Sequence, residues 1–158
     1  NLRRVYVLSQ SGTCSASEAI INGLRGVDVE VIQLGDETCG KPYGFTAKDN
    51  CGISYFPIEF AGVNAKGFGD YSDGFVPAGT GVGGGRKLPG CRLADDFDHA
   101  LSDPAERLLA GAISYRTSGQ CPANTGLSRA QAALGAEGGV AMVLQRAPAR
   151  GNRIAGVR

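Results

Sequence analysis

Apolar and polar positions along the first 35 residues predict two strands around one helix. Residues 4–9 (RVYVLS) are β-branched and aromatic and stop at a polar turn, which predicts a buried strand. Residues 27–34 (VDVEVIQL) alternate apolar and polar side chains like a half-buried strand. Between them the apolar residues recur at helical spacing, namely Ala16, Ala19, Ile20 and Leu24. The pattern predicts a βαβ unit and therefore an α/β fold.

The later part of the chain is less regular. Residues 41–60 predict a β-hairpin, with Phe45 on the outgoing strand, residues 48–50 near the turn and residues 53–56 returning. Residues 61–92 are dominated by Gly, Pro, Asn and Asp and are expected to form a loop. Asp103-Pro104 begins a further helix, whose expected apolar face is Leu108, Leu109 and Ile113. Residues 127–158 form an Ala/Gly-rich tail, in which residues 140–144 predict a final strand.

Composition narrows the class of protein. A chain of 158 residues with 42% hydrophobic residues has room for one domain with a core. Its net charge of +1 and the lack of a basic stripe with aromatics argue against a nucleic-acid partner. The apolar runs are much shorter than a membrane span of about 20 residues, so no transmembrane segment is expected. The chain begins at Asn1 rather than Met, and we expect further sequence upstream.

The five cysteines form no CxxC pair, and only one histidine accompanies them, so no metal site is expected. If the protein is exported, Cys91 and Cys121 are the first pair we expect in a disulfide, because they flank one predicted helix. The odd count leaves one thiol unpaired, and we expect this to be Cys14, as a buried free cysteine.

Ser15 is the candidate nucleophile. A Ser before Ala-Ser-Glu serves in most proteins only as a helix N-cap, and Ser15 with Glu18 forms a capping box. Here, however, a strand and a Gly-containing turn precede it, which places its hydroxyl beside unpaired N–H groups at the positive end of a helix. The N–H of Ala16 is then the expected oxyanion donor for acyl transfer.

Lys41 is the candidate general base. The only histidine, His99, lies in an acidic stretch with no pattern that ties it to Ser15, so a Ser-His-Asp triad is disfavoured. A lysine can take this role if burial lowers its pKa from about 10.4 toward neutrality. Such a lysine must be buried. Lys41 fits best, since it opens a strand directly after the βαβ unit, whereas Lys48, Lys66 and Lys87 lie in polar turns.

Two motifs carry a family resemblance. Residues 11–18 (SGTCSASE) and 34–42 (LGDETCGKP) resemble the C-terminal processing (tail-specific) protease family, which uses a Ser-Lys dyad. The resemblance maps the nucleophile onto Ser15, the base onto Lys41 and a supporting glutamate onto Glu18. Residues 69–77 and the helix after Asp103 fit more loosely. The chain departs from the family pattern at Cys14, where alanine is usual, and at residues 36–37.

The resemblance implies more than the two reacting residues. Residues 1–126 would form the C-terminal part of a protease catalytic domain, the C-terminal half of a crotonase/ClpP-like fold. The expected partners are a polypeptide substrate and upstream PDZ-like and protease segments of the same protein, with homo-oligomers left open. The implied location is the bacterial periplasm or cell envelope, and no cofactor is expected.

Other interpretations are weaker. Residues 79–84 (GTGVGG) match GxGxxG, but no strand precedes them and no helix follows. Asp95, Asp96 and Asp98 lack EF-hand spacing. Cys14 as nucleophile would need a nearby base and an exposed thiolate. An acyl-CoA-handling crotonase-like enzyme would need a phosphate site. A non-hydrolytic peptide-binding or scaffolding domain of the same fold remains the main alternative.

Overall fold

A parallel βαβ unit begins the fold, as predicted. The computed structural model describes residues 2–78 and 83–122, which lie in the compact unit Asn1–Gly126. Strand β1 (Arg4–Ser9), helix α1 (Ala16–Gly26) and strand β2 (Glu30–Gly35) follow one another, and β1 pairs with β2 in parallel. The mixed order of helices and strands makes this an α/β fold.

Three short strands lie where a loop was expected. Strand β9 (Gly90–Arg92) pairs in parallel with β2, so the central sheet has the order β1-β2-β9. Strands β7 (Phe75–Pro77) and β8 (Arg86–Leu88) form a second parallel pair. The loop prediction for residues 61–92 was therefore wrong in these segments. Each strand is three residues long and either follows or begins with a glycine, and it is too short for an alternating pattern to reveal it.

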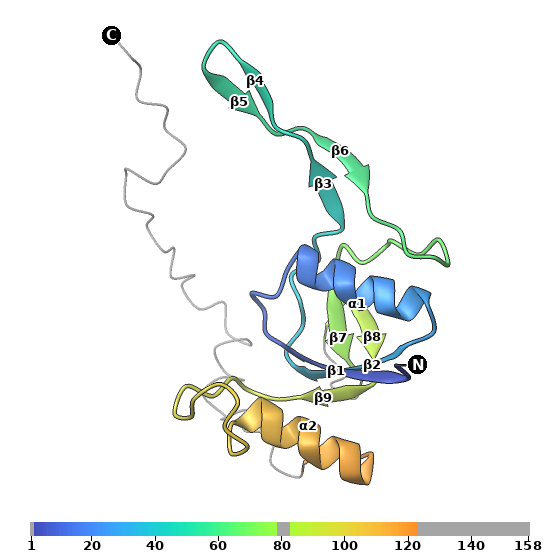
Figure 1. The fold of residues 1–158 in the computed structure, drawn as a ribbon, viewed down its shortest axis with the longest axis vertical. Coiled ribbons are helices and arrows are strands. Elements are labelled where there is room, and N and C mark those ends of the chain that lie inside the picture. The colour runs from blue at the N-terminus through green and yellow to red at the C-terminus, as the bar shows by residue number, and fades with distance from the viewer. Residues whose placement is uncertain (1, 79–82, 123–158) are drawn as a thin grey trace. The chain divides into compact units, whose positions relative to one another are not determined.

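The central sheet is covered on both faces. On one face Ile21 of α1 packs with Val31, Tyr71, Phe75 and Leu88. On the other, helix α2 (Arg107–Ser118) packs through Leu108 and Ala112 against Ile32, Leu34, Cys91 and Leu93. Figure 1 shows α1 and α2 on opposite sides of β1, β2 and β9. Because both faces are covered, residues 31–35 are all buried, and the expected half-buried alternation was wrong.

For strand β1 the predicted burial was wrong in the opposite direction. It was expected to be buried, but only Ser9 is buried, and Leu8 is 42% exposed. It lies at the edge of the sheet, and among the described strands it pairs with β2 alone. An apolar run therefore indicated a strand correctly and its burial incorrectly.

Helix α1 begins where it was expected but presents a different face to the core. Its buried residues are Glu18, Ile21, Asn22 and Gly26, whereas Ile20 is 62% exposed. Asn22 donates to the Phe68 carbonyl at 2.8 Å and accepts from the Asn64 amide at 3.0 Å, so its polar side chain is paired inside the fold. Two buried polar residues thus occupy the inner face that the apolar spacing assigned elsewhere.

Helix α2 begins at Arg107, three residues after Pro104. Its N-cap is Glu106, whose carboxylate accepts from the N–H groups of Leu108 and Leu109, both at 2.8 Å. The predicted start at Asp103-Pro104 was therefore early. Leu108 is buried as expected, but Ile113 is 48% exposed. The Cys91–Cys121 disulfide predicted for an exported protein is present and links β9 to the residues after α2.

A buried amide joins the two parallel strand systems. Gln33 of β2 is fully buried, and its Nε2 donates to Ser9 Oγ, to the Asp36 carbonyl and to the Phe75 carbonyl, each at 3.0 Å. These acceptors belong to β1, to the turn after β2 and to β7. The contacts fix the start of β7 against the carboxyl ends of β1 and β2.

Residues 43–61, which we call the arm, form the predicted hairpin. Strands β3 (Tyr43–Phe45) and β6 (Ile58–Ala61) pair antiparallel, and farther out β4 (Lys48–Asn50) pairs with β5 (Ile53–Tyr55) around a turn at Cys51-Gly52. Almost all arm side chains are exposed, and Figure 1 shows the arm as a narrow pair of strands.

None of the helices within residues 2–78 and 83–122 is long and apolar enough to cross a membrane. The predicted strand at residues 140–144, the tail at residues 127–158 and most of the glycine-rich segment at residues 79–84 lie outside the described residues.

Candidate functional site

Ser15 lies at the junction between a strand turn and a helix. It directly precedes α1, and its backbone has φ 54° and ψ −108°, a conformation that residues other than glycine rarely adopt. Such strain persists only where surrounding contacts hold it, and it is frequent at functional sites. The residue is exposed. The fold therefore presents Ser15 to solvent at the N-terminal end of α1.

The carboxylate of Glu18 joins the two sequence motifs. It is fully buried, and its Oε2 accepts from the N–H of Ser15 at 3.0 Å and from the N–H of Lys41 at 2.7 Å. Its Oε1 accepts from the N–H of Gly40 at 2.7 Å and from Thr38 Oγ1 at 2.5 Å. One oxygen atom thus contacts the backbone of both candidate reacting residues. Glu18 thus holds the backbone of both motifs, whereas its support of a catalytic site stays a prediction.

A disulfide ties the same two segments together. Cys14 is bonded to Cys39, and the N–H of Cys39 donates to the Thr13 carbonyl at 3.0 Å. The expectation that Cys14 is a buried free thiol was therefore wrong. Pairing across the two motifs could not be inferred from one chain, because spacing alone does not fix connectivity. The free cysteine of the described residues is Cys51, which is exposed at the turn of the arm.

Sequence reasoning did not single out Thr38 and Tyr71. Thr38 Oγ1 donates to Glu18 and accepts from the N–H of Phe75 at 2.8 Å, which connects the carboxylate to β7. Tyr71 is buried and stacks on Phe75, and its pKa is raised by burial and then by the negative charge of Glu18. Their signal was present in the two motif-like segments, where Thr38 precedes Cys-Gly-Lys and Tyr71 follows Gly-Asp.

Lys41 is placed near Ser15 by its backbone but not by its side chain. The residue is exposed, and its Nζ lies 5.7 Å from the ring centroid of Phe45. Among the described contacts, no hydrogen bond joins Lys41 Nζ to the Ser15 hydroxyl. The expectation of a buried lysine was wrong, because the strand that follows Lys41 belongs to the exposed arm instead of the covered sheet.

The N–H of Ala16 is free for a ligand. In the first turn of α1, Ser17 donates to the Cys14 carbonyl at 3.2 Å and Ala19 to the Ser15 carbonyl at 2.8 Å. Within the part of the chain that the structure describes, the Ala16 N–H has no such partner. This leaves one helix N-terminal donor beside Ser15, which is the position proposed for an oxyanion contact.

His99 lies elsewhere in the fold. Its Nδ1 is 3.0 Å from Asp96 Oδ2 in the segment before α2, and the residue is exposed. The pKa of Asp96 is lowered, first by the N–H of Asp98 and also by His99. No described contact links this pair to Ser15.

No group of three or more His, Cys, Asp or Glu residues among the described residues is arranged to hold a metal ion.

Comparison with known proteins adds no relative. A scan against protein-family models, a search of curated proteins and a search of solved structures each found no match.

Proposed function

We propose that this chain carries the nucleophile and the general base of a serine endopeptidase, with Ser15 and Lys41 in those roles. The observation that supports it best is the shared Glu18 oxygen, which accepts from the backbone of both residues. The strained backbone of Ser15 and the unpaired Ala16 N–H add to it. The proposal includes the finer fold assignment, a C-terminal part of a crotonase/ClpP-like protease domain.

The chemistry proceeds through an acyl-enzyme. Uncharged Lys41 takes the hydroxyl proton of Ser15 while the serine oxygen attacks the peptide carbonyl. The Ala16 N–H stabilises the resulting oxyanion. Lys41 then gives its proton to the departing amine as the peptide bond breaks. In the second step the Lys41 amine takes a proton from water, the hydroxide attacks the acyl carbonyl, and the proton passes to the Ser15 oxygen as the acyl group is released. The substrate is a polypeptide, and the proposed setting is envelope protein processing or degradation in the bacterial periplasm.

The proposal requires a change in the side chain of Lys41. Its amine must leave the ring of Phe45 and become desolvated, because a general base needs a free lone pair directed at the proton that it accepts. A bound polypeptide or the upstream segments that the resemblance implies would exclude water from it. The movement asked for is one of the side chain, since the Lys41 N–H is held by Glu18, the carboxylate that also accepts from the Ser15 N–H.

A fluorophosphonate probe and a peptide cleavage assay test the proposal in the full-length protein. We expect the probe to label Ser15, the substitution S15A to abolish labelling, and K41A to abolish cleavage without unfolding the protein. The substitutions S17A and K48A are matched controls that should retain activity. The rate should rise with pH through one ionisation. Cleavage that survives K41A in a folded protein would remove Lys41 from the mechanism.

A second candidate function is a non-hydrolytic peptide-binding or scaffolding domain of the same fold. The exposed amine of Lys41, turned toward Phe45, favours it. In that case Ser15 would act only as a helix N-cap. Peptide binding without fluorophosphonate labelling at Ser15 would select this function over the peptidase.

A further inference from the structure

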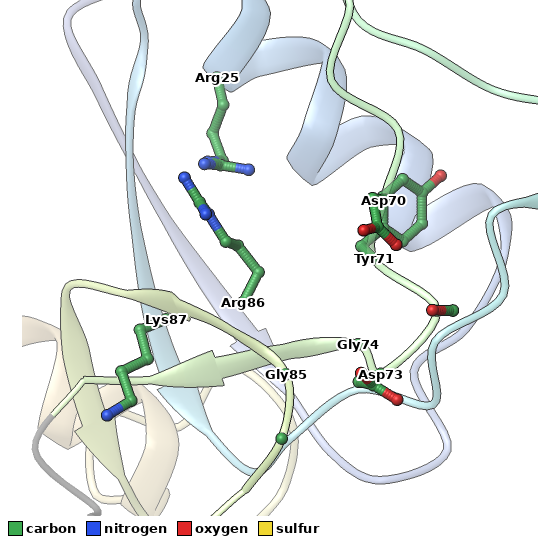
Figure 2. A pocket seen from close by; sticks show the side chains of 10 residues that line it. Arg25, Asp70, Tyr71, Asp73, Gly74, Gly85, Arg86 and Lys87 are labelled. Carbon is green, nitrogen blue, oxygen red and sulfur yellow. The ribbon is translucent and has the colours of Figure 1, made fainter.

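Two arginines face each other beside a cavity on the far end of α1. Arg25, in the last turn of α1, and Arg86, at the start of β8, both line an open cavity of about 530 Å³. Figure 2 shows their guanidinium groups turned toward one another. Both also lie over the ring of Phe68, at 5.2 Å for Arg25 and 5.1 Å for Arg86.

Neither guanidinium group has a hydrogen-bonded partner among the described residues. Within the described residues no hydrogen bond or ion pair engages either guanidinium group, and Arg25 Nη1 is buried without an acceptor. The contact with Phe68 offsets part of the charge but accepts no hydrogen bond along the N–H directions. A buried donor without an acceptor is uncommon, because each such group costs free energy.

The nearby carboxylates do not neutralise this pair. Asp28 and Glu30 line the adjoining cavity, but they form ion pairs with Lys66 and Arg4 respectively. Asp70 and Asp73 line the first cavity on the side away from the two arginines, as Figure 2 shows. The pKa of Arg25 is lowered by burial and then by the positive charge of Arg86. Two like charges are thus held together with an acceptor missing between them.

We propose that Arg25 and Arg86 form a binding site for an oxyanion, a phosphate or a carboxylate, held between the two guanidinium groups. Arginine donors are arranged as a planar fork that matches both anions in a bidentate manner. The anion would supply the acceptor that Arg25 Nη1 lacks and would separate the two like charges. This site does not depend on the peptidase function. If that function holds, the carboxylate at a polypeptide C-terminus is one source of the anion, and free phosphate is another.

Thermal unfolding of the full-length protein in phosphate, against chloride at matched ionic strength, tests the site. A saturating anion should raise the midpoint by about 3 °C or more, because it binds only the folded state. The substitution R86Q should remove the phosphate-specific rise, and K87Q is the matched control that should keep it. In Figure 2 the side chain of Lys87 points away from the two guanidinium groups. If R86Q fails to fold, R25Q replaces it.

A second experiment, a binding titration, identifies the source of the anion. The titrants are one short peptide with a free C-terminal carboxylate and the same peptide amidated at that end. Binding of the free form alone, lost in R86Q, supports a carboxylate site, and a response to phosphate alone supports a phosphate site. The proposal is overturned if neither anion has a specific effect, or if R86Q responds as the wild type does. These readouts use no catalysis, so their failure is separate from a failure of the peptidase proposal.

Discussion

Glu18 and Glu59 both accept hydrogen bonds from backbone N–H groups, but in opposite surroundings. Glu18 is fully buried and joins α1 to the segment that follows β2. Glu59 lies on the arm, where it pairs with Lys48 and accepts from the Thr46 N–H. The sequence places these regions next to one another. In the motif region, residues 9–41, a buried charge and a disulfide hold the backbone, whereas in the arm aromatic side chains and ion pairs are left in solvent.

The two regions should differ in how much stability they lose when a carboxylate is removed. A buried carboxylate replaces water for several donors at once, so its removal strands all of them. An exposed carboxylate is replaced by water at little cost. We therefore expect a single substitution in the motif region to destabilise that whole region, and a single substitution in the arm to have only a local effect.

The largest expected effect comes from Glu18. The substitution E18A removes the acceptor of three N–H groups and the Thr38 hydroxyl, and we expect a loss of about 3–5 kcal/mol in the free energy of unfolding. E59A is the matched control and should change global stability little. Urea denaturation of both variants measures the difference. Equal midpoints for E18A and the wild type would contradict the assignment of Glu18 as the connecting group.

The next largest effect on the free energy of unfolding is expected from the disulfide between Cys14 and Cys39. The double substitution of Cys14 and Cys39 by Ser opens a loop with a sequence separation of 25, and we expect a loss of about 3 kcal/mol. Alkylation of Cys51, the free cysteine on the arm, is the comparison and should leave the unfolding midpoint unchanged. Guanidinium denaturation without reductant measures both. A stabilised double mutant would show that the bond does not hold the motif region together.

The smallest effect is a pH dependence confined to the arm. The pKa of Glu59 is lowered, first by its hydrogen bond with Lys48, so its folded pKa lies below its unfolded one. Its contribution to arm stability is therefore present above the ordinary carboxyl pKa of 4.5 and is lost as the pH falls through the lowered folded value. The Thr46 amide resonance should follow this titration in NMR spectra. A midpoint at or above 4.5 would contradict the pairing. K48A should reduce the shift, because the hydrogen bond with Lys48 is its first cause and the contacts with Thr46 remain.

Local signals in the sequence were sufficient to predict where helices and strands form, but not which face of each element is buried. The strand at residues 4–9, the start of α1 and the hairpin follow from propensity and capping, which act over a few residues. The inner face of α1 does not, because Glu18 and Asn22 become buried only through partners that lie 20 or more positions away, such as Thr38 and Phe68. Tertiary hydrogen bonds overrode the apolar spacing there.

The candidate site was predictable in part for the same reason. The two motifs and their spacing indicated Ser15, Glu18 and Lys41, and backbone contacts bring these residues together in the fold. The direction of the Lys41 side chain was not predictable, since it depends on the arm that follows. The buried β7 was also missed, because burial by residues far along the chain leaves no periodic trace in three residues.

The buried polar contacts also bear on how the domain opens. Glu18 binds Thr38, Thr38 binds the Phe75 N–H, and Gln33 binds both the Phe75 carbonyl and Ser9. This chain of contacts crosses from α1 through β7 and β2 to β1. If one of these elements separated alone, the polar groups of the others would remain buried without hydrogen-bond partners. Local unfolding of a single element therefore costs free energy. We therefore expect the helix and these strands to unfold as a single cooperative unit, even though among the described strands β7 pairs with β8 and not with the central sheet.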